Sequence, residues 1–106
     1  MRLVWICSYG ICRSVTGAAM FGGQAMGLAT GVLTETYAEE SILNADYIFC
    51  FEKWHEEALK NKFPSISKKI YNLDIPDDYL TGDPVLQGLI RDRIINASDI
   101  FNKPKP

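Results

Sequence analysis

The sequence has few of the residues from which metal sites, disulfide frameworks and nucleic-acid interfaces are usually built. Its 106 residues include one histidine and three cysteines, and the formal net charge is −2. A single histidine has no partner at metal-ligand spacing, and an odd number of cysteines does not suggest an extracellular disulfide framework. Nucleic-acid binders usually carry a basic patch. We therefore expect no metal, no cofactor and no nucleic-acid partner.

Long hydrophobic runs are also missing. No apolar run approaches the roughly 18 residues needed to cross a bilayer, and the apolar N-terminal run is interrupted at Ser8 and Gly10. It therefore lacks the length of a secretory signal, and we expect a cytoplasmic, reducing setting and no membrane partner. Hydrophobic residues make up 47% of the chain, enough for one domain with a buried core. We expect a single domain over 1–101 and a polar, disordered tail over 102–106; the oligomeric state stays open.

Two kinds of segment alternate along the chain. Continuous apolar runs predict buried strands, and apolar residues at helical spacing predict the helices between them. Strands joined by helices indicate an α/β fold, a four-stranded parallel sheet with helices on both faces. In such sheets ligands bind outside the carboxyl ends of the strands. The predicted strands are 2–7, 27–33, 46–51 and 69–75, and the predicted helices are 14–26, 36–43, 53–63 and 85–101.

Several single residues have expected places in these elements. Thr36 is expected to cap its helix together with the glutamate three residues on, and Asp83 is expected to cap the last helix, with proline at the first helical position. Trp54 is predicted on the inner face of helix 53–63 and His55 on its surface. Cys50, in the middle of a strand, is predicted to be a core residue.

The stretch CSYGICRS, residues 7–14, carries the strongest chemical signal because it joins a buried strand to a helix. Consecutive amides in such a loop form an anion cradle at the positive end of the helix dipole. Arg13 adds a planar fork that matches two phosphate oxygens, and Cys7 at the base of the cradle is expected to have a lowered pKa. The predicted phosphate-binding residues are Ser8, Tyr9, Gly10, Ile11, Cys12, Arg13 and Ser14.

A purely structural interpretation of this stretch is also possible. Cysteine is often only a small buried hydrophobic residue, and an arginine at a helix start often only faces solvent. The position of Cys7 and Arg13 on either side of a strand-to-helix loop favours the phosphate-binding hypothesis, with Cys7 as a nucleophile aimed at phosphorus.

The segment VWICSYGICRSVTGAAMF resembles the opening of the low-molecular-weight protein tyrosine phosphatases. Their phosphate loop is Cys-x5-Arg-Ser, with a second cysteine directly before the arginine; here these residues are Cys7, Cys12, Arg13 and Ser14. The segments NADYIFCFEKWHEEALKNKFP and LDIPDDYLTGDPVLQGLI are similar to later parts of the family. The resemblance implies hydrolysis through a phosphocysteine, with a phosphorylated protein or a small aryl phosphate as substrate.

This reaction needs a general acid to protonate the leaving oxygen. The segment LDIPDDY is the acid-rich loop that leaves a strand late in the chain. Alignment with the family favours Asp77 as the acid and leaves Asp78 as the main alternative, with Asp74 and Asp83 also open. Tyr79, beside the acid, is predicted either to stack on an aromatic leaving group or to be a hinge contact of a lid.

The loop departs from the family's usual residues at three positions. Tyr9 and Gly10 stand where the family commonly has glycine and asparagine, and Val15 stands where it has proline. Gly10 permits positive φ, so the backbone path of the loop is expected to survive, with Tyr9 at the pocket mouth. The resemblance also implies that Cys12 is a possible redox partner of the nucleophile; the alternative is that Cys12 only packs below the loop.

Three other functions remain open from the sequence. A cysteine phosphoryl carrier of the sugar phosphotransferase type has a similar fold, but it needs neither Arg13 nor an acid loop. An arsenate reductase would need two further cysteines on a mobile segment. A weakened phosphate-binding module is consistent with the changes at Tyr9 and Gly10.

Overall fold

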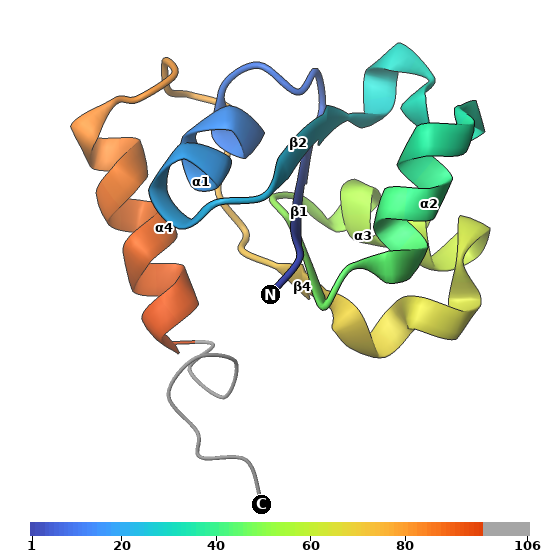
Figure 1. Ribbon diagram of the computed structural model, residues 1–106. Helices are drawn as coiled ribbons and strands as arrows, with labels where there is room; N and C mark the ends of the chain where they lie inside the picture. The colour runs from blue at the N-terminus through green and yellow to red at the C-terminus, as the bar shows by residue number, and fades with distance from the viewer. Residues whose placement is uncertain (97–106) are drawn as a thin grey trace, which may run out of the picture.

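The computed structural model describes residues 1–96 and consists of one sheet covered by helices (Figure 1). The strands are all parallel and lie in the order β2-β1-β3-β4, which confirms the predicted four-stranded α/β fold. Residues 97–101 of the last predicted helix and the predicted tail 102–106 lie outside the described residues. The elements are β1 Leu3–Cys7, α1 Arg13–Phe21, β2 Gln24–Gly27, α2 Thr36–Asn44, β3 Tyr47–Cys50, α3 Lys53–Lys62, β4 Ile70–Asn72 and α4 Pro84–Asn96, with 3-10 helices Leu28–Thr30, Val32–Thr34 and Pro64–Lys69.

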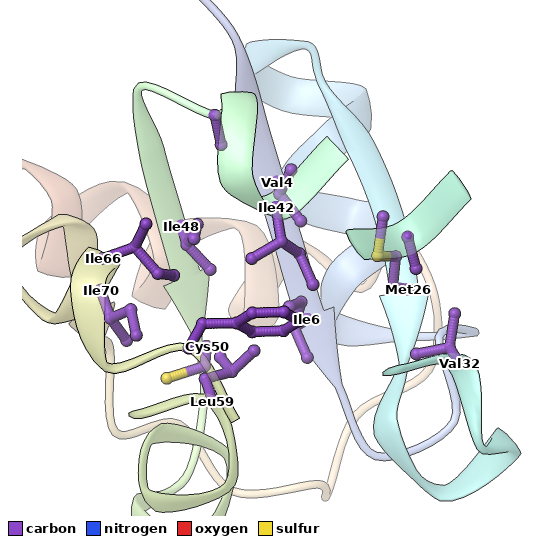
Figure 2. Packing of buried hydrophobic residues seen from close by; sticks show 13 residues of the cluster. Val4, Ile6, Met26, Val32, Ile42, Ile48, Cys50, Leu59, Ile66 and Ile70 are labelled. Atoms are coloured by element: carbon purple, nitrogen blue, oxygen red, sulfur yellow. The ribbon is translucent and has the colours of Figure 1, made fainter. Parts of the chain in front are cut away.

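The side chains of β1 alternate between the two faces of the sheet, as strand geometry requires. Val4 and Ile6 belong to a core cluster with residues of α2 and α3, several of which are labelled in Figure 2. Trp5 and Cys7 belong to a second cluster on the opposite face, with residues of α4. Figure 1 shows α1 and α4 on one side of the sheet and α2 and α3 on the other. The nucleophile candidate Cys7 therefore lies on the α1/α4 face.

Trp5 fills the centre of that face. Its ring is fully buried and stacks on Phe49 at 4.6 Å between centroids, and its indole N–H donates to the Gly22 carbonyl at 2.9 Å. The ring lies so close to α1 that a Cβ on Gly17 would stand 2.4 Å from it. Because Gly17 has no Cβ, α1 can pack closely on the sheet.

The prediction for residues 14–33 is wrong in its details. Helix α1 begins at Arg13 and ends at Phe21, since Gly22 and Gly23 adopt positive φ. The second strand is Gln24–Gly27 instead of 27–33, and two 3-10 turns occupy most of the predicted strand. β2 lies at the edge of the sheet, where β1 is its one neighbour, and it is four residues long. Its run of apolar residues is therefore short.

Three single-residue predictions for helices α2 and α3 are wrong. The N-cap of α2 is Glu35 instead of Thr36, and no side chain caps this end. In α3 the exposed ring is Trp54, at 44%, whereas His55 is fully buried, the reverse of the expectation. Cys50 is buried in the core, as predicted, and burial raises the pKa of its thiol to about 12.

The strand order places the predicted loop at the point where the chain reverses direction across the sheet. β1 is followed by β2 on one side, and β3 then lies on the other side of β1. The crevice between the carboxyl ends of β1 and β3 is the usual ligand position in such sheets. Residues 8–12 follow β1, and Glu52 follows β3, so both contribute to this crevice.

Candidate active site

The loop from Cys7 to Arg13 depends on two glycines that face each other. Gly10 has φ 71, a conformation that residues with a Cβ rarely adopt. A Cβ on Gly27, at the end of β2, would stand 2.2 Å from the carbonyl carbon of Tyr9. The Ser8 carbonyl accepts a hydrogen bond from the Ala29 amide at 2.7 Å, which fixes the loop over β2. This packing holds the backbone amides close to the Cys7 sulfur.

Cys7 Sγ lies at the base of the loop, with 2% of the residue exposed. It is 3.1 Å from the Ser14 hydroxyl and accepts a hydrogen bond from the Gly10 amide at 3.1 Å. Burial alone raises the pKa of the thiol, but hydrogen bonds from the Ser14 hydroxyl and the amides of Ser14, Gly10 and Tyr9 outweigh it. The pKa of Cys7 therefore lies below its ordinary value, as a nucleophilic thiolate requires.

Arg13, at the start of α1, is buried with 1% exposed. Its Nη1 donates to the Ile75 carbonyl at 2.8 Å, and its Nη2 lies 2.8 Å from Glu52 Oε2 and 3.2 Å from Ser8 Oγ. Its Nε is buried and makes no hydrogen bond in the described part of the chain; the closest acid is Asp77, at 3.8 Å. A buried unpaired donor is costly, so Nε is the atom available to an anion.

A hydrogen-bonded group is formed by Arg13 with Ser8, Glu52 and His55. His55 Nδ1 accepts from the amides of Phe51 and Glu52, at 3.2 and 3.1 Å. The neutral imidazole then carries its proton on Nε2, which lies 3.1 Å from Ser8 Oγ. Ser8 Oγ thus accepts hydrogen bonds from both His55 and Arg13. The histidine therefore contacts the arginine through the Ser8 hydroxyl.

The charges of this group are set by the surroundings. Burial and the nearby Arg13 charge lower the pKa of His55 to about 4, against the opposing effect of the Glu52 and Asp77 carboxylates. Burial alone raises the pKa of Glu52, but the hydrogen bond and charge of Arg13 bring it below its usual range. At neutral pH the group therefore consists of an uncharged imidazole and an Arg13–Glu52 ion pair.

A cavity of about 100 Å³ opens above the Cys7 sulfur. Of the acidic residues predicted as candidates, Asp77 is the one that lines it together with Cys7 and Arg13. Tyr9 and Ile11 stand at the cavity with 62% and 63% of each residue exposed. The lining residues are Cys7, Tyr9, Ile11, Cys12, Arg13 and Asp77.

The other predicted acids and Tyr79 have different surroundings. Asp83 Oδ1 accepts from the Val85 amide at 2.8 Å, the capping bond expected at the start of α4. Asp74 and Asp78 are exposed, as Asp77 is, but they do not line the cavity, and Asp74 has φ 55. Tyr79 packs against the core cluster of the α1/α4 face and is not among the residues that line the cavity.

Cys12 is half-buried, carries a free thiol and lines the same cavity as Cys7. Its suggested redox role stays a prediction. In residues 1–96 no group of three metal-binding side chains is positioned for a metal ion. No helix in this range is long and apolar enough to cross a membrane.

Glu52 and His55 were not identified as site residues from the sequence. A signal was present, because a glutamate directly after a buried strand, with histidine three residues on, is a capping-box spacing at a helix start, and the structure has this box. The sequence also places this start at the carboxyl end of the strand, the edge of the sheet where Cys7 lies.

Known structures share this architecture. A protein tyrosine phosphatase aligns with 99% of this chain and 98% of its own, at 19% identity and a TM-score of 0.68. The tyrosine phosphatase Wzb from Escherichia coli K30, solved with phosphate, aligns over 95% and 98% at 15% identity and a TM-score of 0.67. The YwlE arginine phosphatase from Geobacillus stearothermophilus aligns over 99% of both chains at 20% identity and a TM-score of 0.58.

No protein-family profile and no curated protein sequence matches the chain. The structural matches include one described as a low-molecular-weight protein tyrosine phosphatase, from T. tengcongensis, at a TM-score of 0.57. The chain therefore has the fold of the low-molecular-weight protein tyrosine phosphatases, which confirms at the level of fold the relationship expected from the sequence.

Proposed function

We propose that this chain is a phosphomonoester hydrolase, a cysteine-dependent protein tyrosine phosphatase. The observation that carries the proposal is the cavity above Cys7. Its sulfur accepts a hydrogen bond from an amide and lies beside a hydroxyl, and Arg13, whose buried Nε has no hydrogen-bond partner in the described part of the chain, lines the same cavity. This combination suits a phosphoryl group, because the thiolate is a nucleophile and the guanidinium and amides stabilise the phosphate oxygens.

The reaction proceeds in two steps. The Cys7 thiolate attacks phosphorus, an S–P bond forms, and the P–O bond to the leaving group breaks, with its electron pair on oxygen. The carboxyl of Asp77 gives its proton to that oxygen. Water then attacks the phosphocysteine while Asp77 takes a proton from it, and the S–P bond breaks to return the thiolate and release phosphate.

The mouth of the cavity favours an aryl phosphate as substrate. Tyr9 and Ile11 are large, apolar and mostly exposed at the cavity, and such surfaces bind an aromatic ring better than a short aliphatic chain. Phosphotyrosine in a protein, or a small aryl phosphate, fits this surface. The arginine phosphatase among the structural matches makes phosphoarginine the alternative substrate.

The test is hydrolysis of p-nitrophenyl phosphate by the wild type and three variants. Turnover is expected to disappear in Cys7→Ser and to fall by about 10²-fold in Asp77→Asn, the lower end of the usual range for a general acid, because p-nitrophenolate is a good leaving group. Asp78→Asn is the matched control, since it removes the neighbouring carboxyl, which does not line the cavity. Equal losses in the two asparagine variants would contradict the assignment of Asp77.

The same preparation distinguishes the other functions. A stable phosphoprotein without turnover would indicate a phosphoryl carrier, and phosphate binding without turnover would indicate a binding module. Peptides carrying phosphotyrosine or phosphoarginine decide the substrate. We expect the phosphotyrosine peptide to have the higher kcat/KM, and the reverse order would overturn the aryl preference.

A further inference from the structure

The loop that carries Asp77 is fixed at both ends. At its start Ile75, with 1% exposed, donates its amide to the Phe51 carbonyl at 2.9 Å. The Ile75 carbonyl accepts from Arg13 Nη1 at 2.8 Å. The backbone two residues before Asp77 is therefore tied directly to the arginine of the candidate site.

The far end of the loop is tied to the phosphate loop by two threonines. Thr81 Oγ1 donates to the Ile11 carbonyl at 2.8 Å. The Gly82 amide donates to Thr16 Oγ1 at 3.0 Å, and this hydroxyl donates in turn to the Cys12 carbonyl at 2.7 Å. Thr16 is buried, with 2% exposed, and its two hydrogen bonds are partly buried, whereas the bond from Thr81 is exposed.

These two threonines hold consecutive carbonyls of the loop around Cys7. The N–H and C=O of a peptide unit point in opposite directions, so a carbonyl held on the outside favours an amide turned toward the cradle. Gly82 has φ 78, which lets the acid loop turn its amide toward Thr16. The bonds that anchor Thr81 and Gly82 of the acid loop thus also anchor the peptide units directly before Arg13.

We propose that Thr16 and Thr81 are positioning residues that join the acid loop to the phosphate loop and hold Asp77 in place to donate its proton. Neither threonine lines the cavity, so both act through the backbone. The proposal rests on the proposed function and names how the general acid of that reaction is placed.

The test compares kcat/KM for two substrates that differ in their need for an acid. Phenyl phosphate has a poor leaving group and needs the proton, whereas p-nitrophenyl phosphate has a better one and needs it less. The variants are Thr81→Val, Thr16→Val and Thr81→Ser. Thr34→Val is the matched control, because Thr34 makes a similar exposed hydrogen bond to the Gly31 carbonyl at 2.8 Å, away from the acid loop.

Thr81→Val removes one hydrogen bond and Thr16→Val removes two. Each variant is expected to lower kcat/KM for phenyl phosphate by at least about 3- to 10-fold, the effect of one lost hydrogen bond. The loss for p-nitrophenyl phosphate is expected to stay below about twofold. Thr81→Ser is expected to restore the wild-type value, and the control to match it. Equal losses for both substrates, or no loss for phenyl phosphate, would overturn the proposal.

Amide hydrogen exchange tests the physical link without relying on activity. The amides of residues 77–83 are expected to exchange faster in both valine variants than in the wild type, and at the wild-type rate in Thr34→Val. Unchanged exchange in the variants overturns the link even if the enzyme is active. A wild type that hydrolyses neither substrate refutes the proposed function, and the exchange rates then still decide whether the threonines fix the loop.

Discussion

The buried histidine predicts how the stability of the protein changes with pH. His55 is the one histidine of the chain, is fully buried, and has its pKa lowered from 6.5 to about 4. The unfolded chain therefore binds a proton between these pH values that the folded chain does not bind. Because the unfolded state binds more protons there, stability falls as the pH is lowered through this window.

The size of the effect follows from the pKa difference. The difference between 6.5 and about 4 corresponds to about 3 kcal/mol in the free energy of unfolding. About 2 kcal/mol of this is lost between about pH 7 and pH 5. Carboxylates titrate mostly below this range, so the lone histidine dominates the change.

Urea unfolding at intervals of pH measures this slope. His55→Asn is the control variant, since its side-chain oxygen can replace Nδ1 as acceptor but does not titrate. We expect the variant to be less stable at neutral pH, with a nearly flat profile down to about pH 5. A flat wild-type profile, or a variant profile with the wild-type slope, would refute the buried neutral imidazole behind the phosphate loop.

Three further substitutions probe the candidate site. Ser14→Ala removes a hydrogen bond to the sulfur, so the pKa of Cys7 should rise and the pH profile of alkylation by iodoacetamide should move upward; an unchanged profile would argue against it. Gly27→Ala forces the phosphate loop to move, and calorimetry should show phosphate binding weaker by at least about tenfold. Glu52→Gln removes the closer of the two acids beside the buried Arg13, leaving Asp77 at 3.8 Å, and should lower the free energy of unfolding by about 1–3 kcal/mol; a smaller loss in urea would contradict a strong Arg13–Glu52 ion pair.

The sequence predicts the parts of the fold that depend on local pattern. Buried runs mark β1 and β3, and the loop between Cys7 and Arg13 is recognisable because nucleophile and arginine flank a strand-to-helix turn. β2 was misplaced because a short edge strand is selected by its pairing with β1, and not by its own apolar run.

The polar contacts behind the loop could not be predicted in the same way. A hydrophobic scale places Trp54 inside and His55 outside, yet the histidine is buried because two amides and the Ser8 hydroxyl satisfy its nitrogens. The two amides are local, three and four residues before His55, but Ser8 lies 47 residues away in the sequence. The bridge from Thr16 to Gly82 spans a similar distance and carries no local signal.

The central claim is that Cys7 becomes covalently bonded to phosphorus during turnover. The direct measurement is acid quenching within the first turnovers of an aryl phosphate, followed by mass spectrometry of the intact protein and its peptides. The account predicts one added phosphoryl group on the peptide that contains Cys7, and neither adduct nor turnover in Cys7→Ala. Turnover that persists in Cys7→Ala, or a phosphoryl group on another residue, would contradict it.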